Sequence, residues 1–269
     1  MTSLLFFQHF AADPYFNMAF DEWLMTRSAR SPLTILLRLY TWREGAITFG
    51  YNQRQDTALD FTRIGTTPVI RRITGGRALY HDPSELTYAI AMDLSGSGAA
   101  VSGSRASAII AEALRSFLEW EGVAADYVRT SHRQNSRPEF FHKAPCFASA
   151  ARYELMRGEQ KIVASAQRRT GEQLLQHGSI KLRGVARHPA LMLSEQCEGT
   201  VPQPVDSGGF DVYAEHFAHS FAERFGVQMR LGTLAGTDLA EVAKMAGHLR
   251  KNPLEQRETL KQNPGFNSL

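Results

Sequence analysis

Two side chains in the second half of the chain are of the types that carry out acyl transfer, a cysteine and a lysine. Cys146 ends the basic stretch FHKAPC, in which His142 and Lys143 come just before it. Nearby positive charge lowers the pKa of a thiol from about 8.5 and favours the thiolate, which is the nucleophilic form. Taken alone, a free cysteine is more often a small buried apolar residue, so other segments must support a catalytic role for Cys146.

The second cysteine is a weaker candidate for a nucleophile. Cys197 lies between Glu195 and Glu198, whose negative charge raises the pKa of a thiol. Two cysteines are too few for a disulfide framework, which fits a reducing cytoplasm. The two cysteines are also far apart and the chain has no HxxxH pair, so we expect no metal site. The chain also has no GxxxxGK[ST] phosphate loop and no GxSxG nucleophile elbow.

Lys161 opens the segment KIVASAQRR, which has the composition of a strand. Alternation along a strand predicts two faces: Lys161, Val163 and Ser165 on one, and Ile162, Ala164 and Ala166 on the other. The small residues at 164–166 leave room for a ligand beside the lysine. Most lysines on strands only face solvent, so this reading also depends on its context.

Glycines interrupt two further strand-like segments. In VIRRITGGRALYHD, Gly75 and Gly76 follow a pair of arginines, and in LLQHGSIKL Gly178 lies between a histidine and a serine. A glycine inside a strand pattern indicates a bend, a bulge or a place where another molecule approaches the backbone. The Gly75–Gly76 pair alone would favour a hairpin turn.

The elements that must position these residues are predicted from apolar periodicity and from capping residues. Asp13 and Pro14 have the pattern of an N-cap and first helical residue, and Ser104 or Ser107 can cap a helix that runs through Glu121 and ends at Gly122. Further helices are expected at about 211–225 and, capped by Asp238, at 238–249. Strands are expected at 33–40, 46–49, 151–156, 161–168, 174–182 and 227–231, with a hairpin at 157–159. Strands mixed with a few helices, without regular βαβ alternation, indicate an α+β domain.

Composition limits the class of protein. The chain has 269 residues, 43% of them hydrophobic and 21% charged, so it can bury a substantial core. A net charge of +3 is too mild for a dedicated nucleic-acid binder, although local basic stretches at 129–143 and 181–188 could guide an acidic protein. No apolar run reaches about 18 residues, so no membrane span is expected, and the N-terminus lacks the basic region of a signal peptide. We expect a cytoplasmic protein.

Taken together, the motifs resemble those of the lipoate–protein ligase and octanoyltransferase family. RRITGGRALYHD, PCF, KIVASAQRR and QHGSIKL occur in the family's order and spacing. NMAFDEWLM resembles its NMAxDE segment, and LRLYTWREGAITFGYNQ resembles the stretch that follows. The resemblance covers roughly residues 16–182. It implies a biotin/lipoate ligase-like α+β domain, with a mixed sheet and flanking helices around an acyl tunnel, over residues 1–250, followed by a polar tail at 251–269.

The finer resemblance is to the cysteine-dependent octanoyltransferases of Gram-positive type. ATP-dependent ligases of the family tend to carry GGGAV where this chain has GGRAL, and Arg77, ELTYAI and the PCF step all resemble the transferases. The resemblance implies transfer of an octanoyl group from acyl carrier protein to a lysine of the glycine cleavage H protein or another lipoyl domain, with no cofactor. It implies that Cys146 forms the acyl-enzyme and that Lys161 stabilises charge on the acyl carbonyl.

The same resemblance implies a set of substrate-binding residues. Arg71 and Arg72 would lie at the mouth of the tunnel, and Gly75 and Gly76 would let the backbone lie against the acyl chain. The others are Arg77, His81, Ala164, Ser165, Ala166, His177, Gly178 and Ser179. The family usually has glycine at the position of Ala164, which adds one methyl group to the expected pocket.

Three alternatives stay open. The chain could be an ATP-dependent lipoate ligase, in which Cys146 would be incidental. It could be an amidotransferase that moves octanoyl between lipoyl domains, which differs only in the donor. A non-catalytic acyl-binding protein is the third alternative, although binding alone requires neither Cys146 nor Lys161.

Overall fold

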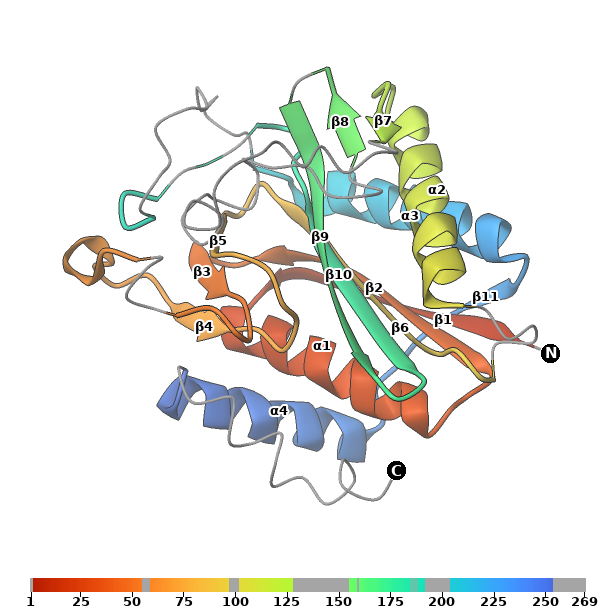
Figure 1. Ribbon diagram of the computed structural model, residues 1–269, viewed down its shortest axis with the longest axis horizontal. Coiled ribbons are helices and arrows are strands. Elements are labelled where there is room, and N and C mark those ends of the chain that lie inside the picture. The colour runs from red at the N-terminus through yellow and green to blue at the C-terminus, as the bar shows by residue number, and fades with distance from the viewer. Residues whose placement is uncertain are drawn as a thin grey trace.

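The computed structural model describes residues 2–54, 59–96, 102–127, 155–158, 160–184, 186, 188–191 and 204–253. These residues form a large mixed sheet, a small second sheet and flanking helices (Figure 1). The strand order of the large sheet is β11-β1-β2-β6-β10-β9-β8-β7. Its strands are β1 (Ser3–Ala12), β2 (Thr34–Trp42), β6 (Leu86–Asp93), β7 (Asp126–Tyr127), β8 (Leu155–Arg157), β9 (Gln160–Thr170), β10 (Gln173–Ile180) and β11 (Gln228–Leu231).

Strand direction makes the large sheet mixed. β1 is parallel to both β2 and β11, whereas the other neighbouring pairs are antiparallel. The small sheet has the order β4-β3-β5 and consists of β3 (Ala46–Phe49), β4 (Val69–Arg71) and β5 (Leu79–His81). The expected α+β class with a mixed sheet is confirmed.

Helices cover both faces of the large sheet. α2 (Gly103–Trp120) and α3 (Ser207–Phe225) pack on one face, where Phe117, Phe217 and Phe221 join a core with Tyr88 and Ile90 of the sheet. α1 (Pro14–Ala29) and α4 (Gly236–Lys251) lie on the opposite side, as Figure 1 shows. Burial of apolar side chains on both faces is the main stabilising contribution, and it fixes the central strands on which the site is built.

Helix starts depend on where a side-chain oxygen can reach a free backbone N–H. Asp13 caps α1 as expected, since Oδ1 accepts hydrogen bonds from the backbone N–H groups of Tyr15 and Phe16. α2 begins earlier than expected, because Ser102, not Ser104 or Ser107, supplies the capping oxygen. α4 also begins earlier, after Ala235, and Asp238 lies in its first turn instead of capping it.

The first strand was not expected from the sequence. β1 lies between β2 and β11, and its apolar side chains point to both faces: Leu4 and Phe6 to the core beneath α2 and α3, Phe7 to the core beneath α1. A strand buried on both faces shows no apolar–polar alternation. The signal that identifies a half-buried strand is therefore missing from SLLFFQHFAA.

The end of α4 leads back toward the small sheet. The carbonyl of Pro253 accepts a hydrogen bond from the backbone N–H of Arg71, at 3.0 Å. This contact ties the first residues of the expected C-terminal tail to β4. The division into a domain over 1–250 and a tail over 251–269 stays a prediction, and residues 254–269 lie outside the described part. In the part of the chain that the structure describes, no helix is long and apolar enough to cross a membrane.

Candidate active site

A narrow cavity lies between the small sheet and the middle of the large sheet, on the face that α1 covers. Met18 of α1, Tyr40 of β2, Thr48 of β3 and Thr87 of β6 form part of its wall, with Leu79. Eight of the expected substrate-binding residues form the rest: Arg72, His81, Ala164, Ser165, Ala166, His177, Gly178 and Ser179. The two short motifs on β9 and β10 meet there because these strands pair with Ser179 opposite Ala164 and Gly178 opposite Ser165.

Gly178 must be glycine because of its packing on the side of the sheet that α2 and α3 cover, where it pairs with Tyr88. A Cβ atom on Gly178 would lie 2.7 Å from Tyr88 Cε1 and 2.8 Å from the carbonyl oxygen of Ala164. Tyr88 occupies this position because its hydroxyl shares a hydrogen bond of 2.7 Å with Ser165 Oγ. Only glycine therefore allows the strands and the tyrosine to pack as they do.

A β-bulge in β9 changes the expected position of Lys161. Leu155 pairs with Val163 and Met156 pairs with Lys161, so Ile162 is an extra residue. Ile162 and Val163 both pack into the core beneath α2 and α3. Alternation therefore shifts by one residue, and Lys161 takes the face of Ala164 instead of the opposite one. Lys161 is 4% exposed and is not itself part of the cavity wall. Cys146 lies outside the described residues.

Arg72 organises the glycine loop at one end of the cavity. Its Nη1 donates to Thr48 Oγ1 at 3.2 Å, and its Nη2 donates to the carbonyl oxygens of Gly75 and Arg77, both at 2.8 Å. A Cβ atom on Gly76 would lie 2.6 Å from this Nη2, and Gly76 has a φ of +92°, which favours glycine. The loop is thus folded around a buried guanidinium.

This arrangement differs from the expected role of the glycines and of Arg71. Neither Gly75 nor Gly76 lines the cavity. A Cβ atom on Gly50 would lie 2.0 Å from the carbonyl oxygen of Gly76, so the close approach is between two backbone segments. Arg71 stacks over Phe49 and donates from Nη1 to the carbonyl oxygens of residues 50, 51 and 53, each at 2.9 Å. It holds that turn and is not part of the wall, and neither is Arg77.

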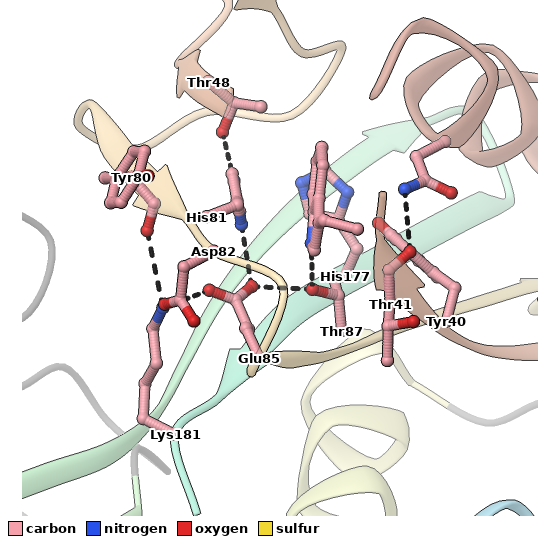
Figure 2. Close-up of polar contacts among 12 residues, drawn as sticks. Tyr40, Thr41, Thr48, Tyr80, His81, Asp82, Glu85, Thr87, His177 and Lys181 are labelled. Carbon is pink, nitrogen blue, oxygen red and sulfur yellow. Dashed lines mark hydrogen bonds and ion pairs between the residues drawn. The ribbon is translucent and has the colours of Figure 1, made fainter. Parts of the chain in front are cut away.

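His81 lies within a chain of hydrogen bonds that Figure 2 shows. Its Nδ1 is 2.7 Å from Glu85 Oε1 and its Nε2 is 2.7 Å from Thr48 Oγ1. The ring stacks on Trp42, with centroids 4.2 Å apart. Burial lowers the pKa of His81, against the raising effect of Glu85, which favours the neutral ring. Because an ionised carboxylate only accepts, the hydrogen lies on Nδ1 and the Thr48 hydroxyl donates to Nε2.

Glu85 is ionised although it is fully buried. Burial alone would raise its pKa, but the charge of Lys181 and the hydrogen bonds from His81 and Lys181 lower it to about 2. Lys181 contacts both Glu85 and Asp82 (Figure 2). Burial lowers the pKa of Lys181, but these two carboxylates outweigh that effect and raise it. Thr87 Oγ1 also donates to Glu85, at 2.6 Å.

His177 is held in the same manner by a different carboxylate. Its Nδ1 is 2.9 Å from Asp21 Oδ2 and its Nε2 is 2.5 Å from Thr74 Oγ1. Arg38 and Tyr40 bind the same carboxylate, Arg38 through Nη1 at 3.2 Å and Tyr40 through its hydroxyl at 2.9 Å. Two carboxylate–histidine–threonine chains thus lie beside the cavity. In the second one Thr74 is fully buried and lies outside the wall.

Sequence reasoning did not identify the residues that hold the two histidines. Asp21, Arg38, Thr48, Glu85 and Lys181 are all at most 1% exposed. A signal was present, since charged residues stand inside the apolar segments TILLRLY and HGSIKL. A buried charge requires a partner, although the sequence does not say which one. Within the described ranges, no group of three His, Cys, Asp or Glu side chains could hold a metal ion.

Comparison with known proteins places the chain among enzymes of protein lipoylation. The octanoyltransferase LipM of Kyrpidia tusciae is 32% identical over 240 residues, which cover 83% of this chain and 87% of that protein. The octanoyltransferase LipM of Moorella thermoacetica is 36% identical over 176 residues, 64% of this chain and 62% of that protein. The solved structure of Ta0514 from T. acidophilum with bound lipoic acid shares the fold, with a TM-score of 0.66 at 19% identity, covering 94% of this chain and 96% of that one.

A family model gives the same assignment. Residues 13–208 match the lipoyl protein ligase A/B catalytic domain. This range contains every expected site residue, including His81 and His177. The chain therefore belongs to the lipoyl protein ligase A/B catalytic domain family.

Proposed function

We propose that this protein is an octanoyltransferase of lipoate biosynthesis, which transfers an octanoyl group to a lysine of a lipoyl-domain protein. The observation that carries the proposal is the similarity to octanoyltransferases named LipM, which extends over 83% of the chain in one relative. The cavity supports it, because the small residues Ala164, Ala166 and Gly178 stand in its wall on β9 and β10.

Cys146 is the proposed nucleophile. Its thiolate attacks the octanoyl thioester of the donor, the carrier's sulfur leaves, and an octanoyl-cysteine forms. The basic residues of FHKAPC favour the thiolate. The lysine of the acceptor protein then attacks this second thioester and takes the octanoyl group as an amide.

Lys161 is the proposed electrostatic partner of the acyl group. Its ammonium would stabilise the negative charge that develops on the carbonyl oxygen in both transfer steps. The bulge in β9 supports this role, because it turns Lys161 to the face that carries Ala164 of the cavity wall. No metal or cofactor is needed for either step.

The proposed donor is octanoyl-acyl carrier protein, and the proposed acceptor is the glycine cleavage H protein or another lipoyl domain. Both kinds of partner are typically acidic, and the basic stretch at 129–143 is suited to bind them. In the stretch at 181–188, Lys181 is buried against Glu85 and Asp82 and is not available to a partner. We place the reaction in the cytoplasm, where these partners occur.

Intact-protein mass spectrometry tests this function. The protein is mixed with octanoyl-acyl carrier protein in the absence of ATP, and we expect one octanoyl adduct that is absent from Cys146→Ala. Cys146→Ser and Cys146→Ala should also fail to modify the H protein while keeping a wild-type circular dichroism spectrum.

The outcomes separate the rival activities. Turnover retained in either Cys146 variant would exclude the cysteine mechanism. A product that forms only with ATP and free octanoate would indicate a lipoate ligase, whereas an adduct formed only from octanoylated H protein would indicate an amidotransferase. Binding of octanoate with no turnover under any of these conditions would indicate an acyl-binding protein.

A further inference from the structure

The proposed reaction requires a base that the proposed function does not supply. A lysine side chain has a pKa of about 10.4 and arrives at neutral pH as an ammonium, which has no lone pair for attack on a thioester. A group beside the acyl chain must therefore accept a proton from the nitrogen. The base must itself be unprotonated, and it must lie in the wall of the cavity or reach the wall through a hydroxyl group.

Two histidines lie in the wall, and the structure distinguishes between them as routes for the proton. His177 Nε2 faces Thr74, which is fully buried and lies outside the wall. His81 Nε2 faces Thr48, and both of these residues line the cavity. A proton from the cavity can therefore reach His81 through one hydroxyl, whereas Thr74 offers no such path to His177.

We propose that Thr48 and His81 form a proton relay for the acceptor amine, and that Glu85 and Lys181 are its positioning residues. The inference rests on the proposed octanoyl transfer. Glu85 holds the His81 hydrogen on Nδ1, so that the lone pair of Nε2 faces the hydroxyl of Thr48. Lys181 in turn keeps the carboxylate ionised and in place (Figure 2).

The protons and bonds balance as follows. The ammonium donates to Thr48 Oγ1 while the Thr48 hydroxyl passes its own hydrogen to His81 Nε2. The freed amine attacks the carbonyl carbon, a C–N bond forms, and the C–S bond of the thioester breaks. Two protons leave the nitrogen in total; one ends on the departing sulfur and the other reaches solvent from His81. No oxidant, reductant or metal takes part.

The charges around His81 suit a neutral proton acceptor. Glu85, Lys181 and Arg72 are the charged groups that act on the ring, and the aromatic face of Trp42 covers it. Arg72 Nη1 donates to Thr48 Oγ1, at 3.2 Å. This contact orients the hydroxyl hydrogen toward Nε2, because the oxygen already accepts from the guanidinium.

The test compares two acceptors in single-turnover experiments with pre-formed octanoyl-enzyme. One acceptor is the apo H protein, whose lysine is protonated at pH 7. The other is hydroxylamine, whose nitrogen is unprotonated at that pH and needs no base. We expect His81→Gln and Thr48→Val to slow transfer to the lysine by about 10²- to 10⁴-fold, with the hydroxylamine rate nearly unchanged. Thr48→Ser keeps the hydroxyl and should restore transfer to the lysine.

Two further readouts exclude a merely structural role. In His81→Gln the rate of transfer to lysine should rise about tenfold per pH unit between pH 7 and 9, following the fraction of free amine. Glu85→Gln removes the charge that raises the pKa of His81, so the acidic limb of its pH–rate profile should move to lower pH. His216→Gln is the matched control. His216 lies on α3 and its Nδ1 is 2.9 Å from Glu121 Oε1, but it is not part of the cavity wall.

These experiments distinguish a failure of the relay from a failure of the proposed octanoyl transfer. If the wild-type protein forms no octanoyl adduct, octanoyl transfer itself is wrong. If the adduct forms but His81→Gln transfers to lysine at the wild-type rate, the relay is wrong. Equal loss of both acceptors in His81→Gln and in Thr48→Val would assign these residues to the fold or to the acyl site, which also overturns the relay.

Discussion

His177 Nδ1 lies 2.9 Å from Asp21 Oδ2, and this contact joins the first helix to β10 across 156 residues of sequence. The same carboxylate accepts from Arg38 Nη1 and from the hydroxyl of Tyr40. Three separate segments, NMAFDEWLM, LRLYTW and QHGSIKL, therefore meet at one buried charge. The shape of the cavity depends on this contact because His177 is part of the cavity wall.

The Asp21 carboxylate should be among the most important polar groups for stability. Asp21→Asn leaves the guanidinium of Arg38, which is fully buried, without its ion-pair partner. Breaking such a pair costs about 3–5 kcal/mol of unfolding free energy, which urea denaturation would measure. Arg43→Gln is the control, because Arg43 is exposed where it pairs with Asp13, and it should change the unfolding free energy by at most about 0.5 kcal/mol. Equal effects of the two variants would contradict this account.

The packing at Gly178 gives a second prediction. Gly178→Ala would place a methyl group 2.7 Å from Tyr88 and 2.8 Å from the carbonyl of Ala164. We expect it to destabilise the fold by about 1–3 kcal/mol, as overpacking of a core does, and to lower octanoyl transfer.

The matched change is Gly247→Ala, within the C-terminal half of α4, where an added Cβ meets nothing within 4 Å. It should stabilise the fold by about 0.5–1 kcal/mol, since alanine favours a helix over glycine. Thermal unfolding of both variants tests this, because Gly178→Ala should melt below the wild type and Gly247→Ala above it. A Gly178→Ala protein that melts with or above the wild type would show that β9 and β10 can separate without cost.

Local patterns predicted the elements with the clearest signals. Asp13 and Pro14 located the start of α1, and the strand at 46–49 lies where expected. β1 was missed because it is buried on both faces, and the face of Lys161 was wrong because a single extra residue in β9 reverses the alternation. A single extra residue in β9 leaves no mark in the nearby sequence, and the apolar run LLFF in β1 lacks the alternation that identifies a half-buried strand.

The same limit explains the site. The resemblance to a known family predicted twelve substrate-binding or neighbouring residues, and the structure places eight of them in one cavity wall. The residues that hold these side chains in place could not be predicted, because they come from distant segments. Glu85 pairs with Lys181, 96 residues away, and Asp21 pairs with His177. Sequence shows that a buried charge needs a partner, and only the fold shows which residue it is.

Glu85 should make stability depend on acid pH. Its pKa is about 2 in the folded protein and near its ordinary 4.5 in the unfolded chain. A carboxyl whose folded pKa is lower contributes stability above pH 4.5, and that contribution is lost as the pH falls from about 4.5 to about 2. Glu85→Gln should therefore be less stable than the wild type at pH 7, and the two should converge as the pH approaches 2.

Urea denaturation at pH 7, 4 and 3 measures this convergence. Glu119→Gln, which changes an exposed carboxyl on α2, should stay within about 0.5 kcal/mol of the wild type throughout. A gap between Glu85→Gln and the wild type that stays constant with pH would show that Glu85 stabilises the fold by shape alone.

Glu22, one residue after Asp21, should act in the opposite direction. Burial raises its pKa to about 7, against the lowering effect of Arg168. A carboxyl with a raised folded pKa binds its proton more tightly in the folded state, so its charge destabilises the fold as the pH rises from about 4.5 through 7. Glu22→Gln removes that charge and should be more stable than the wild type at pH 8. The side chain is partly exposed, so the gain should be on the order of 1 kcal/mol. Urea denaturation at pH 4, 6 and 8 should show the gain at pH 8 and its disappearance at pH 4, and a variant that gains most at pH 4 would contradict the raised pKa.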